Sequence, residues 1–108
     1  METHHSLNEN QKIVIKIDPE LAELIPAFLK NRESDIRGLN ESLAKSDYVI
    51  IERLGHGMKG AGAGFGFDEI TEIGALIEKA AKEKKSDEIQ KGIEKLTNYM
   101  KLLEVTYE

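Results

Sequence analysis

Apolar residues recur every three or four positions from residue 18 onward, which is the period of an amphipathic helix. Asp18-Pro19-Glu20 predicts the start of the first helix, because it sets a capping side chain, a proline and an acidic residue in the order that helix N-termini favour. Pro26 lies inside this helix and should kink it. A second helix is predicted from about residue 32 to residue 45. The apolar stripes of these two helices are, in order, Leu21, Leu24, Ile25, Phe28 and Leu29, and then Ile36, Leu39 and Leu43.

The same spacing predicts three more helices. They begin at Ser46-Asp47, Phe67-Asp68 and Ser86-Asp87. Because the loops between them are very short, successive helices should pack antiparallel. The pattern therefore predicts an all-α fold, an antiparallel four-helix bundle with a short additional helix at the N-terminus. The inward stripes of the last three helices are Ile50, Leu54, Met58, Ala61 and Phe65; Ile70, Ile73, Ile77 and Ala80 or Ala81; and Ile89, Ile93, Leu96, Met100, Leu103 and Tyr107.

The first residues do not follow this pattern. Residues 1–11 are polar and aperiodic, and we expect them to be a flexible tail ahead of a single domain at residues 12–108. Residues 13–17, Ile-Val-Ile-Lys-Ile, have the composition of a strand. No other segment of the sequence is predicted to pair with them, so we expect them to lie extended against the core.

Composition narrows the classes of function. A chain of 108 residues with no cysteine is one domain without disulfides or thiolate metal sites. The net charge of −5, with acidic and basic residues interspersed, leaves no basic face for nucleic acid. The longest uninterrupted apolar run, residues 48–51, is far too short to span a membrane, and the N-terminus does not resemble a signal peptide. We therefore expect a cytoplasmic protein that binds neither membrane nor nucleic acid.

The most unusual stretch runs from Leu54 to Gly66 and holds six of the nine glycines. Its first part, residues 55–60, matches the G-x-G-x-x-G pattern of dinucleotide-binding loops. Against that interpretation, apolar residues continue through the glycines at helical spacing, and the two helices predicted after Gly60 leave no further strand for a parallel sheet. A Walker A loop is excluded because Ala61 stands where its lysine must be, and a kinase glycine-rich loop because no kinase-sized domain follows.

A helix over residues 47–65 places five glycines in its interior, and each lowers helix stability by ~0.8–1 kcal/mol relative to alanine. Small residues must therefore be needed here for close approach. Gly57, Gly60 and Gly64 remove bulk around His56, which points away from the predicted apolar face. The glycines would then let the surface of another protein approach the imidazole.

The neighbours of His56 indicate its chemistry. Glu52 and Arg53 lie one turn before it, and Lys59 and Gly60 lie one turn after it. A lysine at this position can neutralise the oxygens of an incoming phosphoryl group. An accessible imidazole beside such a cation suits phosphoryl transfer to a histidine nitrogen. The alternative is an ordinary surface histidine without a role.

At this point the sequence resembles the histidine-containing phosphotransfer (HPt) domains of multistep two-component phosphorelays. Their motif is a histidine, an apolar residue two positions later, Lys-Gly, two small residues, and a glycine ten positions after the histidine. Gly62, where serine or alanine is usual, and Met58, where leucine is commoner, are mild departures. The likeness extends over residues 18–105. The motif positions are His56, Met58, Lys59, Gly60, Ala61, Gly62 and Gly66.

The resemblance implies a phosphocarrier without ATP-dependent kinase activity of its own. His56 would accept the phosphoryl group at Nε2, Lys59 would steady the phosphoryl oxygens, and Gly60 would leave room for the partner. The implied partners are response-regulator receiver domains and a hybrid sensor histidine kinase. The chain itself would need no cofactor or metal, because the receiver supplies Mg²⁺.

Packing suggests one more site residue. The third and fourth helices turn around near Gly66, so a residue ten before the turn should face one about ten after it. That pairs His56 with Ile77, which belongs to the core stripe, or with Glu78. Glu78 could accept the Nδ1 proton and leave Nε2 free; a solvated glutamate without a role is the alternative. The expected docking face comprises Glu52, Arg53, Gly57, Lys59, Gly60, Ala63 and Gly64.

Three hypotheses therefore stand. The first is the phosphorelay carrier, the second a helical adaptor in which His56 is inert, and the third a fragment of a nucleotide-binding enzyme. The sequence does not identify the kinase, the receivers, the direction of net phosphoryl flow or the output.

Overall fold

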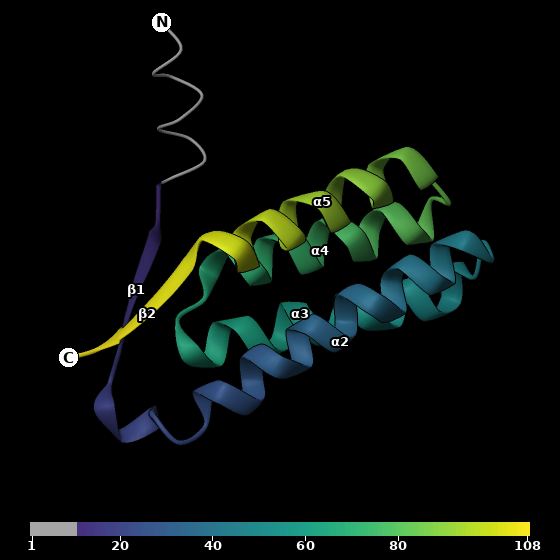
Figure 1. The fold of residues 1–108 in the computed structure, drawn as a ribbon. Coiled ribbons are helices and arrows are strands. Elements are labelled where there is room, and N and C mark those ends of the chain that lie inside the picture. The colour runs from purple at the N-terminus through teal and green to yellow at the C-terminus, as the bar shows by residue number, and fades with distance from the viewer. Residues whose placement is uncertain (1–10) are drawn as a thin grey trace, which may run out of the picture.

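The four amphipathic helices of the predicted bundle are present in the computed structural model, which describes residues 11–108. They are α2 (Ile25–Ala44), α3 (Tyr48–Phe65), α4 (Asp68–Lys82) and α5 (Ser86–Leu102). Each packs against two others, α2 against α3 and α5, and α4 against α3 and α5. Figure 1 shows α5 beside α4 and α2 beside α3. The predicted four-helix bundle is confirmed. The tail expected at residues 1–11 lies outside the described residues except for its last position.

Short turns join these helices and hold successive ones antiparallel. The Asp47 side chain caps α3 by accepting a hydrogen bond from the Ile50 amide at 3.3 Å. Gly66 ends α3 in the left-handed conformation (φ 86°), which is strained for any residue with a side chain. Helix α5 begins at Ser86 as predicted, but Lys85 occupies the N-cap and makes no side-chain capping bond. Ser86 Oγ lies 2.6 Å from the Tyr48 hydroxyl.

The N-terminal helix differs from the prediction. Asp18 does cap a helical start, but only one 3₁₀ turn, η1 (Pro19–Leu21), forms there. The helices predicted before and after residue 32 are one continuous helix, α2. Pro26 occupies the first turn of α2, where its missing N–H has no intrahelical partner to lose. The kink expected at Pro26 is therefore wrong.

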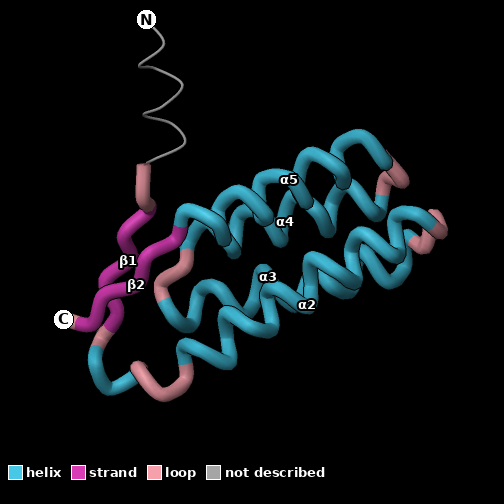
Figure 2. Tube along the Cα trace, in the orientation of Figure 1, coloured by secondary structure: helices cyan, strands magenta, loops and turns pink. Residues whose placement is uncertain are grey.

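The structure also contains a small parallel sheet that the sequence interpretation excluded. Strand β1 (Ile13–Ile17) pairs with β2 (Leu103–Tyr107), with Ile13 opposite Leu103 and Ile17 opposite Tyr107. Figure 2 shows the two strands side by side at one end of the bundle. The fifth helix was expected to continue to Tyr107 but ends at Leu102, because Leu103 adopts an extended backbone (ψ 132°).

The core lies between the four helices and is closed at one end by the sheet. In α3 the buried positions are Ile51, Gly55, Met58 and Gly62. Of the predicted stripe, Ile50 is wrong, because it is 40% exposed and Ile51 is buried instead. Met58 is buried as expected, and the other stripe residues pack partly buried against the core: Leu54, Ala61 and Phe65. Two of the glycines in α3, Gly55 and Gly62, face inward, which a stripe defined by apolar side chains does not predict. The stripes predicted for α4 and for the first part of α5 are buried as expected.

Two further observations bear on function. The G-x-G-x-x-G match lies wholly inside α3, and residues 49–51 before it are helical, so no dinucleotide-binding loop exists there. Among the described residues, no helix has both the length and the apolar character needed to cross a membrane.

Candidate functional site

His56 stands on an open part of α3. Its side chain is 70% exposed. A Cβ added to Gly57, Gly60 or Gly64 would have no atom within 4 Å, so nothing in the described chain crowds this face. An approaching surface can therefore reach the outer edge of the imidazole.

The inner edge of the ring is held by Glu78 of α4. The His56 Nδ1 and Glu78 Oε2 atoms are 2.9 Å apart. The other oxygen, Oε1, lies 2.9 Å from Lys59 Nζ. The Glu78 side chain is only 12% exposed, and so one nearly buried carboxylate bridges the histidine and the lysine. The facing of His56 and Glu78 expected from the turn at Gly66 is present.

This contact determines the tautomer of the neutral ring. Hydrogen bonds from Lys59 first, and from His56 second, hold the pKa of Glu78 below its ordinary value of 4.5. Glu78 is therefore a carboxylate at neutral pH and can only accept hydrogen bonds. The proton must lie on Nδ1, and the lone pair of Nε2 faces outward, which is the arrangement needed in a nucleophile.

Close backbone contact between α3 and α4 brings these side chains together. A Cβ on Gly55 would lie 2.7 Å from the Glu78 amide nitrogen and 2.9 Å from the Gly74 carbonyl oxygen. A Cβ on Gly74 would lie 2.6 Å from the Lys59 amide nitrogen. Gly55 and Gly74 thus set the distance at which Glu78 meets His56 and Lys59. Neither was predicted as a site residue, although a glycine in the middle of α4 is a signal that close approach is required.

A hollow of about 420 Å³ lies beside the histidine and is lined by Val49, Glu52, Arg53, His56 and Glu78. Val49 is 67% exposed and adds an apolar side chain to this lining, which the sequence interpretation missed. Val49 belongs to the apolar run at residues 48–51, in which only Ile50 was given a place in the fold. Glu52 also approaches Lys82 of α4 at 4.0 Å.

The predicted docking residues are thus divided between two areas. Glu52 and Arg53 line the hollow on one side of His56. Ala63 and Gly64 are exposed about two turns beyond His56 and lie outside the hollow. Gly57, Lys59 and Gly60 lie between these two areas. Within residues 11–108, no three side chains of His, Cys, Asp or Glu are grouped so as to hold a metal ion.

A comparison with protein-family models finds a match to the Hpt domain over residues 23–106. The matched region contains all four helices and His56. Comparisons with curated proteins and with solved structures found no match.

Proposed function

The chain belongs to the family of histidine-containing phosphotransfer domains, and from this premise we propose that His56 carries the phosphoryl group. Domains of this family transfer phosphoryl groups through a histidine in phosphorelays, as carriers and not as kinases. In the proposal, His56 accepts a phosphoryl group from a receiver-domain aspartate or a hybrid sensor histidine kinase, and passes it to the aspartate of another receiver. The supporting observation is the exposed ring whose Nδ1 is bonded to Glu78.

The chemistry follows from the tautomer. The Nε2 lone pair attacks phosphorus, the N–P bond forms, and the O–P bond of the aspartyl phosphate breaks to leave a carboxylate on the donor. No proton leaves Nε2, because Nε2 carries none. The ring becomes cationic with its proton still on Nδ1, and the Glu78 carboxylate stabilises that charge. In the second transfer, the N–P bond breaks and the phosphoryl group passes to the aspartate of another receiver.

Lys59 has two acceptors in this proposal. In the unphosphorylated protein its ammonium group pairs with Glu78 Oε1. When a phosphoryl group is present on His56, one turn earlier on α3, the ammonium group moves to the phosphoryl oxygens. Its three N–H donors allow it to bond to a phosphoryl oxygen while staying close to Glu78. Lys59 thus steadies the charge that arrives with the phosphoryl group.

The remaining groups for phosphoryl transfer come from the receiver domain that docks on this chain. We propose that the receiver docks over His56 and the open glycines, with Val49 as an apolar contact, and that Mg²⁺ belongs to the receiver. The carrier needs no cofactor of its own and has no ATP-dependent kinase activity. A chain without cysteine suits a reducing compartment, and we propose the cytoplasm as its location.

Incubation with a phosphorylated receiver tests the proposal. Label that is lost in acid but stable in base should appear on the wild-type chain and not on His56→Gln. Lys82→Gln is a matched control, because Lys82 lies at the edge of the same surface and should leave labelling in place. A wild-type chain that stays unlabelled with several active donors contradicts the carrier function.

A further inference from the structure

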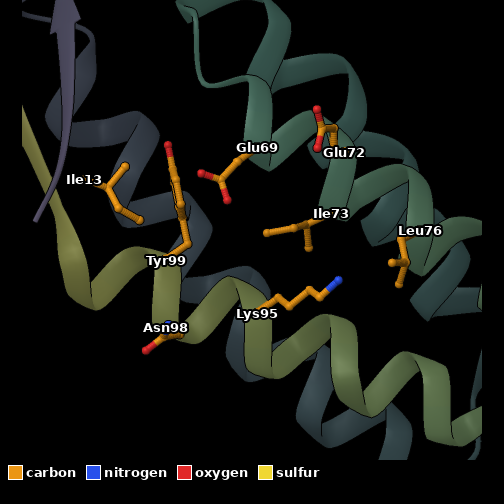
Figure 3. A pocket seen from close by; sticks show the side chains of 8 residues that line it. All are labelled: Ile13, Glu69, Glu72, Ile73, Leu76, Lys95, Asn98 and Tyr99. Atoms are coloured by element: carbon orange, nitrogen blue, oxygen red, sulfur yellow. The ribbon is translucent and has the colours of Figure 1, made fainter. Parts of the chain in front are cut away.

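A second cleft, of about 340 Å³, lies between α4, α5 and β1 (Figure 3). It is separate from the His56 site. Glu69 on its wall precedes Glu78 by nine residues, or about two and a half turns at 3.6 residues per turn, so their side chains leave α4 in opposite directions. The cleft and the phosphoryl site therefore use opposite sides of α4. The lining residues are Ile13, Glu69, Glu72, Ile73, Leu76, Lys95, Asn98 and Tyr99.

Tyr99 places an unpaired polar atom in this cleft. The residue is only 3% exposed, and its buried hydroxyl makes no hydrogen bond to any residue that the structure describes. Figure 3 shows the hydroxyl directed between Ile13 and the carboxylate of Glu69. A buried hydroxyl without a partner destabilises a fold by roughly 1–3 kcal/mol, so a ligand that donated a hydrogen bond to it here would stabilise the fold.

The charges around the hydroxyl favour a cation. Glu69 and Glu72 line the cleft, and neither makes an ion pair within residues 11–108. Lys95 is the only cationic side chain of the lining. Burial first, and the charges of Glu69 and Asp68 second, raise the pKa of Tyr99 to about 12, so the hydroxyl is neutral at physiological pH. Burial disfavours a charge of either sign, whereas the charges of Glu69 and Asp68 disfavour only a phenolate and attract a cation.

The helix dipole explains only part of this arrangement. Asp68 and Glu69 in the first turn of α4 complement its N-terminus, as acidic residues commonly do. That role requires neither a buried tyrosine hydroxyl beside them nor Glu72 in the second turn. It also does not require the apolar wall that Ile73 and Leu76 add to the cleft.

We propose that this cleft binds a small organic amine in its ammonium form. The ammonium group donates hydrogen bonds to the Glu69 carboxylate and the Tyr99 hydroxyl oxygen, and a short apolar chain lies along Ile73 and Leu76. Glu72 adds to the attraction from the rim. The volume suits a small molecule better than a peptide segment. This proposal does not depend on the phosphocarrier function.

The test uses three probes of similar length that differ in charge: n-butylammonium, 1-butanol and butyrate. Backbone amide NMR shifts of the full chain are followed during titration. Butylammonium should produce saturable shifts at Glu69, Glu72, Ile73 and Tyr99 with a Kd on the order of 1 mM, the affinity expected of a ligand of this size. The shifts with butanol should be much smaller, and butyrate should produce none.

Variants then identify the groups that bind. Tyr99→Phe keeps the ring and removes only the hydroxyl, and it should weaken butylammonium binding about tenfold, as should Glu69→Gln. Glu41→Gln, an exposed position on α2, is the matched charge control and should bind as the wild type does. His56→Gln should also bind normally, which separates this proposal from the phosphocarrier function.

Three results would overturn the proposal. One is the absence of saturable shifts with butylammonium, which would mean that water alone satisfies the hydroxyl. Another is equal binding of butyrate or butanol, which would remove the role of charge. The third is unchanged binding by both Tyr99→Phe and Glu69→Gln.

Discussion

Two groups of glycines on α3 look alike in the sequence and differ in the structure. Gly55 and Gly62 face α4, where an added Cβ would come within 2.6–2.9 Å of its nearest neighbours. Gly57, Gly60 and Gly64 face open space, with nothing within 4 Å of an added Cβ. We call the first group, together with Gly74 of α4, the buried glycines, and the second group the open glycines.

The difference shows two separate uses of one residue. The buried glycines let the backbones of α3 and α4 touch, and this contact brings Glu78 within reach of His56 and Lys59. The open glycines make no contact in the chain that could offset their loss of ~0.8–1 kcal/mol each in helix stability. This agrees with the proposal that they leave room for a partner that approaches from outside. The buried glycines build the site, and the open glycines keep it accessible.

The largest effect is expected at a buried glycine. Gly55→Ala places a methyl group against backbone atoms of α4 that cannot move independently, and overpacking of this kind destabilises a core by about 1–3 kcal/mol. The matched control Gly57→Ala should instead stabilise the chain by ~0.8–1 kcal/mol. Urea denaturation measures both free energies of unfolding. Equal stability of the two variants would remove the distinction between buried and open glycines.

The next largest effect is expected at an open glycine. It should change the rate of phosphoryl transfer without a loss of stability of the fold. Gly60→Leu should fold normally, because the new side chain meets nothing within the chain. It should slow phosphoryl transfer from a receiver by about tenfold or more, a rise of roughly 1.4 kcal/mol in the barrier. Ala27→Leu, on an exposed face of α2, is the control. Wild-type transfer rates in Gly60→Leu would show that partners do not approach over this face.

A smaller effect is expected from the contact that the buried glycines create. Glu78→Ala removes the acceptor of the Nδ1 proton, and transfer should slow about fivefold, in line with the roughly 1 kcal/mol that one hydrogen bond contributes. Glu72→Ala on the far side of α4 should transfer at the wild-type rate. Single-turnover labelling measures both rates. If Glu78→Ala keeps the full rate, Glu78 has no positioning role.

The smallest effect is a pH dependence of stability. The pKa of Glu78 is lower in the folded chain than its ordinary value of 4.5. Its contribution to the free energy of unfolding is therefore complete above the ordinary pKa of 4.5 and is lost as the pH falls below that value and through the pKa of the folded state. The difference in unfolding free energy between wild type and Glu78→Gln should therefore be larger at pH 7 than near pH 3. A difference independent of pH would mean that the carboxylate is not held by Lys59 and His56.

Most of the fold could be predicted from the sequence, because helical spacing of apolar residues is a local signal. The strand at the end of α5 was missed because its apolar residues fit two patterns at once. Leu103 and Tyr107 are four residues apart, which fits one face of a helix and also one face of a strand. Only Val105 between them distinguishes the two. The partner strand at residues 13–17 lies some ninety residues away, beyond the reach of any local pattern.

The candidate site shows the same limit. His56 and Lys59 could be identified from their local spacing, and Glu78 from counting around the turn at Gly66. The inward face of α3 was only partly predicted: Met58 is buried as expected, but Gly55 and Gly62 were not counted as possible core positions. That error hid both the contact between Gly55 and Gly74 and the exposure of Val49. Close approach of two helices depends on both partners at once, and so it cannot be deduced from either segment alone.

Direct observation of the His56 ring nitrogens tests the account most closely. Long-range ¹H–¹⁵N NMR of the side chain, recorded where the ring is neutral and again after transfer from a receiver, reports which nitrogen carries the proton and which the phosphorus. The account predicts a proton on Nδ1 before transfer and a phosphoryl group on Nε2 after it. A neutral ring protonated on Nε2, or a phosphoryl group on Nδ1, would contradict it.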